Sequence, residues 1–442
     1  MLLAVLAFVW QQHFGGPNSG DHVNTKAVAV DTSGNAFSVG SFTSSAAGIS
    51  FGGAALVATG VSEDIFITKF TSAGAYAWSK RFGSSGTDVG YGVGTDSSGN
   101  VYITGQFQGT VDFGGGNLVA ANADIFVLKL DSAGNYVWQK QLTGTGNDLA
   151  YAISVNSSGT FVISGEFGSF GGGVNFGGGV LTSAGSSDIF VAEYDSSGTY
   201  VWAKQIGGSG TDRGFAVAID STGVAAVTGD YRSSVQLGCG SIISNGLADI
   251  PVVKFSSTGG ITWVRRFGGT SDDRGTGIAI GPSGEVLVTG YFDGTINFGG
   301  GVRPDSGGGV DIFLAKYTTN GVWTWDKVFG SPIGVDSPRA VAVDSSGNIS
   351  MVGDLDNPLD FGCGSFGENS STNVLITKFT SAGACISSAR YGDLSDDHGY
   401  GVAFDSSGNL IIGGTYSAGI NFGGGQMTSP GGYDGFLVKF SP

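Results

Sequence analysis

Short segments in which apolar and polar residues alternate recur along the whole chain, and tight-turn sequences separate them. Within residues 87–142 the segments GYGVGT, VYITG, DIFVLKL and YVWQKQL follow one another. Alternation of this kind, with many β-branched and aromatic residues, is typical of strands rather than helices. The turn sequences DSSGN and DSAGN place glycine where a tight turn requires a positive φ. The pattern predicts four antiparallel strands in this part of the chain.

The same four-strand pattern occurs seven times. The residue that begins the turn between the first and second strands marks each repeat, at intervals of 60 to 65 residues: Asp31, Asp96, Asn156, Asp220, Gly281, Asp344 and Asp405. A fixed period of this kind is the signature of a propeller or a solenoid. Four antiparallel strands repeated seven times predict an all-β fold, a single seven-bladed β-propeller over residues 1–442.

The two ends of the chain indicate how such a ring closes. The chain begins inside a repeat, with a fourth-strand sequence around Trp10, and its last segment, GFLVKF, is a third strand. If residues 1–20 supply the outer strand of the last blade, this strand pairs with residues 435–440. The pairing covers a strand edge that would otherwise be exposed. We therefore expect a ring closed by the N-terminal strand.

The composition excludes two classes of partner. Acidic residues outnumber basic ones by 36 to 20, which leaves a formal charge of −16. Such a chain repels phosphate backbones, so we expect no nucleic-acid partner. No apolar stretch reaches the length of a membrane span. The N-terminal MLLAVLAFVW has neither the basic region nor the cleavage site of a signal peptide, so no such peptide is evident.

The three cysteines, Cys239, Cys363 and Cys385, are too few for a disulfide framework. Cys239 and Cys363 occupy the same position in different repeats and are expected to lie too far apart to bond. Cys385 stands where other repeats have Tyr76 or Tyr136. We expect all three cysteines to be buried and to pack as small hydrophobic residues.

The units DSSGNVYITG, FGGG, ADIFVLKLDSAGN and VWQKQL resemble the bacterial SBBP-type β-propeller repeat. The resemblance extends over essentially the whole chain and is specific for the fold. It implies a bacterial protein of the extracellular space or the cell envelope. It supplies no catalytic residues that could be transferred to this chain.

The direction of the strands predicts which face carries function. The connections between blades and the connections from the second to the third strand emerge on one face, which we call the long-loop face. The opposite, tight-turn face receives only the SSGN and SAGN turns. Binding residues are frequent on loops that a rigid scaffold holds. We therefore expect binding on the long-loop face, at the mouth of the central channel.

One aspartate precedes the first strand of every repeat: Asp21, Asp88, Asp148, Asp212, Asp273, Asp336 and Asp397. A ring of carboxylates could hold Ca²⁺, which prefers oxygen ligands. Alternatively, each carboxylate accepts nearby backbone N–H groups and fixes the turn between blades. Seven equal copies favour the structural role. Calcium is the one possible ion, and no other cofactor is predicted.

Positions that differ between the repeats are better candidates for binding. Near the start of the first strands lie aromatic and basic side chains: Lys26, Tyr91, Tyr151, Arg213, Arg274, Arg339, His398 and Tyr400. Such side chains around a shallow mouth can stack on a sugar or a peptide and form hydrogen bonds with it. The alternative is packing between blades with a few solvated charges.

No catalytic signature is recognisable in the sequence. Serine is abundant but histidine is scarce, so no triad can be assembled, and the glycine-rich runs lead into strands rather than helices. We predict a non-enzymatic module that binds a protein or a glycan at the cell surface. One alternative is a structural subunit of a surface assembly, as a homo- or hetero-oligomer. A hydrolase or lyase acting on polysaccharides is a less favoured alternative.

Overall fold

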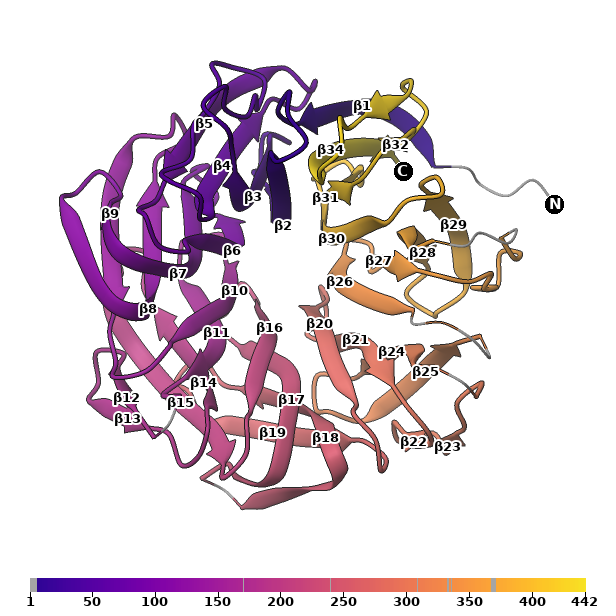
Figure 1. Ribbon diagram of the computed structural model, residues 1–442. Helices are drawn as coiled ribbons and strands as arrows, with labels where there is room; N and C mark the ends of the chain where they lie inside the picture. Colours follow the sequence, from indigo (N-terminus) through magenta and orange to yellow (C-terminus); the bar gives the residue numbers. More distant parts are fainter. Residues whose placement is uncertain are drawn as a thin grey trace.

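The computed structural model describes residues 6–169, 171–238, 240–307, 309–331, 334, 336–366 and 371–442. Every regular element in this part of the chain is a β-strand. No helix among these residues is long and apolar enough to cross a membrane. The strands form small antiparallel sheets arranged around a central axis (Figure 1).

The blades are numbered in chain order, and their strands run from the centre outward. Blade 1 contains β2 (His22–Val30), β3 (Ala36–Thr43), β4 (Asp64–Phe70) and β5 (Tyr76–Phe82). Blade 2 contains β6 (Val89–Thr95), β7 (Val101–Asp112), β8 (Asn117–Leu130) and β9 (Tyr136–Leu142). Blade 3 contains β10 (Leu149–Val155), β11 (Phe161–Phe167), β14 (Asp188–Tyr194) and β15 (Tyr200–Gly208). Blade 4 contains β16 (Arg213–Ile219), β17 (Ala225–Gln236), β18 (Ser241–Phe255) and β19 (Ile261–Phe267).

Blade 5 contains β20 (Arg274–Ile280), β21 (Val286–Phe292), β24 (Asp311–Tyr317) and β25 (Trp323–Phe329). Blade 6 contains β26 (Ser337–Val343), β27 (Ile349–Leu355), β28 (Asn373–Phe379) and β29 (Cys385–Tyr391). Blade 7 contains β30 (Asp397–Phe404), β31 (Leu410–Tyr416), β34 (Asp434–Ser441) and β1 (Ala7–Phe14). Three short hairpins project from the second connections: β12 (Gly173–Asn175) with β13 (Val180–Thr182), β22 (Ile296–Asn297) with β23 (Val302–Arg303), and β32 (Gly419–Ile420) with β33 (Met427–Thr428).

The ring closes as the sequence predicts. β1 pairs antiparallel with β34, with Phe14 opposite Gly435 and Ala7 opposite Ser441. The two ends of the chain therefore share blade 7, where indigo and yellow strands lie side by side in Figure 1. Blades 3 and 4 are additionally joined, because the end of β15 pairs with the end of β17.

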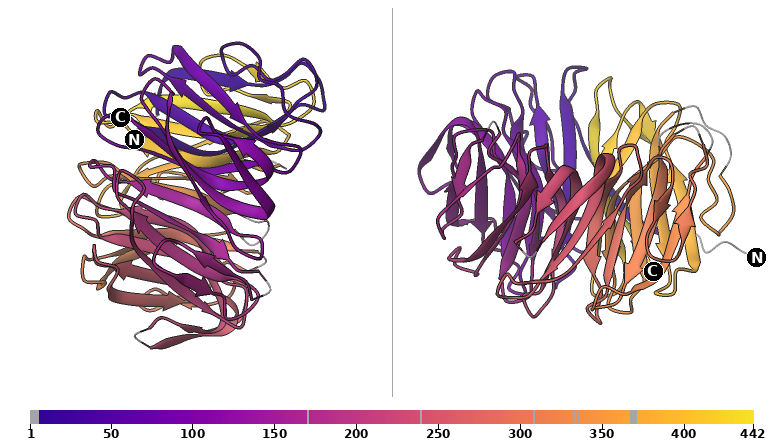
Figure 2. Two further views of the ribbon diagram at one scale, coloured as in Figure 1. Left: turned by 90° about the vertical axis from the view of Figure 1, so that its left-hand side faces the viewer. Right: turned by 90° about the horizontal axis from the view of Figure 1, so that it is seen from below.

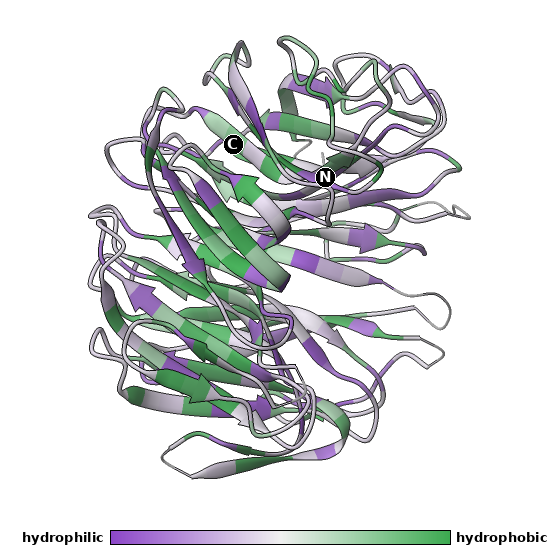
Figure 3. Cartoon of the chain, turned by 60° about the vertical axis from the view of Figure 1, so that its left-hand side comes forward, coloured by the Kyte–Doolittle hydropathy of each residue, from purple (hydrophilic) through white to green (hydrophobic). Residues whose placement is uncertain are grey.

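The blades lie side by side around the ring (Figure 2), and hydrophobic residues recur along their strands (Figure 3). Buried apolar side chains of neighbouring blades pack together, as those of blades 1 and 2 do. In blades 1, 2, 3, 5 and 7 the phenylalanine of the FGG sequence after the second strand is buried and packs on a phenylalanine of the third strand, as Phe51 does on Phe66 at 4.6 Å between ring centroids. Phe113 and Phe126 repeat this contact at 4.7 Å in blade 2. These ring pairs account for the recurrence of phenylalanine in five blades, whereas blade 4 has Leu237 at the loop position and Phe361 of blade 6 packs on Phe329.

A polar contact on the tight-turn face also joins neighbouring blades. Lys69 Nζ and Trp78 Nε1 of blade 1 both donate hydrogen bonds to the Ser132 carbonyl oxygen of blade 2, at 2.9 and 3.4 Å. Equivalent pairs are Lys129 with Trp138, Lys254 with Trp263, Lys316 with Trp325, and Lys439 with Trp10. The recurrent tryptophan is thus a residue of the scaffold, as its regular spacing predicts.

Candidate functional site

Every innermost strand has a β-bulge at the same position. In blade 2, Gly90 pairs with Gly105 and Gly92 pairs with Thr104, so Tyr91 between them has no partner in the ladder. The register shifts at the same point in all seven blades, at Lys26, Tyr91, Tyr151, Phe215, Thr276, Arg339 and Tyr400. A bulge changes the direction in which a side chain points. Here it brings one residue per blade to the channel mouth.

A glycine in the second strand makes the bulge possible. The backbone of β6 comes so close to Gly105 that a Cβ there would collide with the carbonyl oxygen of Val89. A Cβ at the equivalent glycine of each other blade would likewise collide with a carbonyl oxygen of the first strand. These glycines are Gly40, Gly165, Gly229, Gly290, Gly353 and Gly414. This close approach explains why each VYITG-like segment ends in glycine.

The seven bulged residues surround one cavity at the long-loop end of the channel. It has a volume of about 490 Å³, and Arg274, Tyr291, Val310 and Ser337 complete its described lining. A narrower space of about 190 Å³ continues below it. The walls of this lower space are small and β-branched side chains, such as Ala152 and Ile153. The seven bulged residues also line the top of this lower space, so the channel encloses less volume below the mouth than at it.

Most of the predicted site residues meet at this mouth. Lys26, Tyr91, Tyr151, Arg274, Arg339 and Tyr400 line the cavity. The other two stand beside the lining residues: the guanidinium of Arg213 lies 5.3 Å from the ring centroid of Phe215, and the ring of His398 lies 5.9 Å from that of Tyr400. The structure thus brings the predicted residues together, and their binding of a ligand stays a prediction.

One half of the mouth is aromatic. Tyr91 and Tyr151 pack edge to face with centroids 5.6 Å apart, and Tyr151 and Phe215 lie 5.4 Å apart. The Tyr151 hydroxyl donates a hydrogen bond to the carboxylate of Glu166. Burial raises the pKa of Tyr91 to about 12, and the negative charges of Glu63 and Glu166 add to the effect. This half therefore presents neutral phenols and apolar ring faces.

The other half of the mouth carries positive charge over ring faces. Arg339 and Lys26 lie 5.5 and 5.1 Å from the centroid of Tyr400, and Arg274 lies 5.0 Å from that of Phe215. Such contacts are cation–π interactions. Burial lowers the pKa of Lys26, and the charge of Arg339 lowers it further, although Glu63 opposes the shift. Among the described residues, no hydrogen-bond acceptor contacts Lys26 Nζ.

Two carboxylates hold the arginines in place from behind. Asp230 accepts hydrogen bonds from Arg213 Nη2 at 2.7 Å and from Arg274 Nε at 3.2 Å. Asp354 accepts from Arg339 Nη2 at 2.6 Å, and it lies 3.3 Å from His398 Nδ1. Burial opposes the charge of Arg213, but the hydrogen bonds and charge of Asp230 outweigh it and raise the pKa of this arginine.

These carboxylates belong to a second variable ring that the sequence analysis missed. Its members follow the second-strand glycine directly: Ser41, Gln106, Glu166, Asp230, Tyr291, Asp354 and Thr415. Arg213 lies opposite Asp230, and Ser337 lies opposite Asp354, in the strand ladder. The signal was present in the sequence, because this position varies among the repeats beside a glycine that does not.

The seven repeated aspartates have a different role. Asp88 is fully buried, and its two oxygens accept the backbone N–H groups of Ser84 and Gln108 at 2.6 and 2.9 Å. The other six are also buried and also accept backbone N–H groups: Asp21, Asp148, Asp212, Asp273, Asp336 and Asp397. This geometry agrees with a structural role. Within the described residues no group of three or more acidic, histidine or cysteine side chains could hold a metal ion, and calcium binding stays an untested prediction.

The buried aspartates predict an unusual dependence of stability on pH. Burial raises the pKa to about 6 for Asp88, Asp148 and Asp336, and to about 7 for Asp212, Asp273 and Asp397. Since the ordinary pKa of an aspartate is 3.8, the folded state binds more protons than the unfolded state between about pH 4 and pH 7. The free energy of unfolding therefore falls as the pH rises through this window. We expect a higher Tm at about pH 5 than at about pH 8.

Asp148→Asn isolates one of these groups. Only Oδ1 of Asp148 has a hydrogen-bond partner among the described residues, the Gly168 N–H at 2.7 Å, so an amide oxygen can replace it. We expect the variant to gain about 1–2 kcal/mol of stability at about pH 8 and little at about pH 5. Scanning calorimetry over this range measures both values. A wild-type Tm that rises from pH 5 to pH 8 would contradict the prediction.

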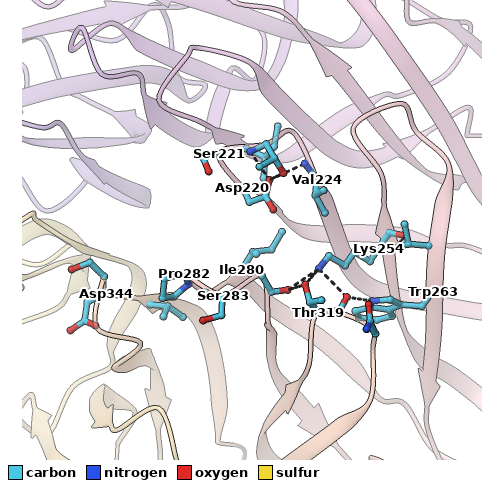
Figure 4. Close-up of a pocket in the computed structure, with 18 residues that line it drawn as sticks. Asp220, Ser221, Val224, Lys254, Trp263, Ile280, Pro282, Ser283, Thr319 and Asp344 are labelled. Atoms are coloured by element: carbon cyan, nitrogen blue, oxygen red, sulfur yellow. Dashed lines mark hydrogen bonds between the residues drawn. The ribbon is translucent and has the colours of Figure 1, made fainter.

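A larger cavity of about 820 Å³ lies on the tight-turn face between blades 4, 5 and 6 (Figure 4). Lys254 Nζ donates to the Gly284 carbonyl oxygen at 2.7 Å, and Trp263 Nε1 donates to the Thr319 carbonyl oxygen at 3.0 Å. These are the polar contacts that join neighbouring blades elsewhere in the ring. Lys254 and Trp263 therefore use their N–H donors to join neighbouring blades.

The expectation for the cysteines is wrong for two of the three. Cys363 and Cys385 form a disulfide within blade 6, with their Cα atoms 5.7 Å apart, and neither is fully buried. In blade 2, Gly115 and Tyr136 occupy the same two positions, and the tyrosine ring covers the glycine. The disulfide replaces this contact. Cys239 lies outside the described residues.

Comparisons with known proteins agree with the fold. The family SBBP, a beta-propeller repeat, matches residues 77–106. An uncharacterized WD repeat-containing protein of Acanthamoeba polyphaga mimivirus is 25% identical over 415 residues, covering 76% of this chain. Regulatory protein FlaEY of Caulobacter vibrioides is 26% identical over 285 residues, covering 58% of this chain. The matches span 30% and 29% of the lengths of these relatives.

Among solved structures, Sqt1 from Chaetomium thermophilum has a TM-score of 0.45 and 10% sequence identity, and the alignment covers 99% of both chains.

The residues that match the SBBP repeat can be located in the structure. Residues 77–106 contain most of β5, the connection to blade 2, all of β6 and the first half of β7. These elements include the bulge at Tyr91 and the glycine at position 105. The segment that matches the SBBP beta-propeller repeat is therefore the one that builds the bulge in blade 2.

Proposed function

We propose that this protein is a non-enzymatic binding module that holds a protein or a glycan at the mouth of its central channel. The observation that carries the proposal is the ring of seven bulged residues. The scaffold repeats one position in every blade, yet the residue there is lysine, tyrosine, phenylalanine, threonine or arginine. All seven side chains line one cavity. Variation at a position that faces a shared cavity supports a role in binding.

The position of the carboxylates favours binding over catalysis. Asp230 and Asp354, which lie directly behind the mouth, are each bonded to an arginine. Such pairing fixes both partners in place, which suits the positioning of the arginines. The shape also fits binding, since small-ligand sites commonly enclose about 300–1,000 Å³.

The disulfide supports a location outside the cytoplasm. Disulfides persist in oxidising compartments and are rare where thiols are kept reduced. The Cys363–Cys385 bond thus fits the extracellular space or the envelope of a bacterium. A rigid ring with a variable mouth suits a surface protein that meets partners from the surroundings.

The test compares two triple variants of the full chain on a glycan array and on an immobilised peptide library. Tyr91→Ala, Tyr151→Ala and Phe215→Ala together remove the aromatic half of the mouth. Ser221→Ala, Ser283→Ala and Ser345→Ala together change the opposite, tight-turn face and serve as the control. We expect wild type and control to bind the same spots, and the mouth variant to bind them at least about tenfold more weakly. Absence of binding by the wild type in both libraries would refute the proposal.

A further inference from the structure

We infer that the mouth recognises an acidic sugar, a pyranose that carries a carboxylate, as in oligosaccharides of uronic acids. The inference rests on the proposed function and specifies its ligand. Three observations carry it: the sign of the charge around the cavity, the way in which the arginines are held, and the division of the mouth into a cationic and an aromatic half.

The residues that line the mouth cavity differ in charge from the chain as a whole. Acidic residues outnumber basic residues by 36 to 20 in the chain. Nevertheless, Lys26, Arg274 and Arg339 all line the mouth cavity, and its described lining contains no carboxylate. Positive charges around a concave surface attract anions and raise their local concentration. The lining therefore suits a negatively charged group, because Asp230 and Asp354 lie behind the arginines and do not line the cavity.

The arginines are held in place and still have free donors. Asp354 and the Tyr400 ring fix Arg339, and Asp230 and the Phe215 ring fix Arg274. Their side chains remain 40% and 30% exposed. A guanidinium has five N–H donors, and within the described residues Arg274 uses only Nε. A carboxylate can bind these remaining donors without a loss of side-chain freedom, which favours affinity.

The aromatic half fits the sugar ring. Tyr91, Tyr151 and Phe215 form a continuous row of rings across blades 2, 3 and 4. An apolar ring face covers the C–H face of a pyranose, and a phenol oxygen can accept from its hydroxyls. A uronate is therefore oriented with its carboxylate toward Lys26 and Arg339.

The experiment is isothermal titration of the full chain with trisaccharides of galacturonate, mannuronate and guluronate, and with the same trisaccharides after reduction of their carboxylates to alcohols. We expect binding of at least one acidic trisaccharide and a loss of at least about tenfold for its reduced form. Lys26→Gln and Arg339→Gln are each expected to weaken binding by at least about tenfold. Arg303→Gln is the matched control. Arg303 lies on the hairpin of β22 and β23, pairs with Asp326 of β25, and does not line the mouth cavity. Circular dichroism verifies that each variant is folded.

The outcomes separate this inference from the proposed function. Equal affinity for the acidic and the reduced trisaccharides would overturn the inference, as would equal weakening by Arg303→Gln and Arg339→Gln. Binding to acidic peptides but to no trisaccharide would also overturn it, while a mouth that binds protein would stand. Absence of binding to all sugars and peptides would refute both.

Discussion

Replacement of Gly105 by alanine is expected to lower the free energy of unfolding by about 3 kcal/mol or more. The new Cβ would collide with the carbonyl oxygen of Val89 and lie 3.0 Å from the ring of Phe126. Neither group can move independently, because β6 and β7 are paired on both sides of the bulge and Phe126 stacks on Phe113. Relief requires separation of the two strands, which removes hydrogen bonds and disturbs the direction of Tyr91.

Gly20→Ala is the matched control. A Cβ at Gly20 has open space around it, so the same change of side chain should alter stability by less than about 0.5 kcal/mol. Chemical unfolding of the wild type and both variants measures the two differences. A Gly105→Ala protein as stable as the wild type would show that the close approach of the strands does not determine the bulge.

Loss of the Cys363–Cys385 disulfide is expected to lower the free energy of unfolding by about 3 kcal/mol. The bond closes a loop between residues 22 positions apart, and its loss restores conformational freedom to the unfolded chain. Cys363→Ser tests this, and so does reduction of the wild type. Thermal unfolding with and without a reducing agent should give a lower Tm for the reduced protein and no effect on the variant.

A rescue variant distinguishes the role of the bond from that of the packing. Cys363→Gly with Cys385→Tyr converts blade 6 to the arrangement of blade 2, in which Tyr136 covers Gly114 and Gly115. We expect this double variant to recover part of the lost stability and to be insensitive to reduction. If Cys363→Ser and wild type unfold at the same denaturant concentration, the bond does not contribute to stability.

The architecture was predictable because its signals are local and repeated. Each strand and turn can be predicted from a few neighbouring residues, and comparison of the seven repeats corrects a wrong prediction made in one of them. The ring closure was also predictable, because a fourth-strand sequence around Trp10 and a third-strand sequence at the other end complete each other. The choice of the long-loop face followed from strand direction alone.

The bulge and the disulfide were not predicted, because both depend on contacts across strands. The glycine of VYITG is compatible with an ordinary strand, and only the approach of the Val89 carbonyl oxygen shows why glycine is needed. Cys363 and Cys385 occupy two positions that touch in the other blades, as Gly115 and Tyr136 do. The sequence does carry a signal for the disulfide, because both positions hold cysteine in the same repeat. Comparison of one position at a time does not detect it.

The bulged position has a consequence for how this surface can diversify. A residue outside the ladder makes no cross-strand pair, so its identity is released from the constraints that govern its neighbours. Lysine, tyrosine and threonine already occupy it in blades 1, 2 and 5. A combinatorial library restricted to these seven positions can therefore change the lining of the mouth while the scaffold keeps its sequence. The ring behaves in this respect like the variable loops of an antibody, but with the variation at one residue in each blade.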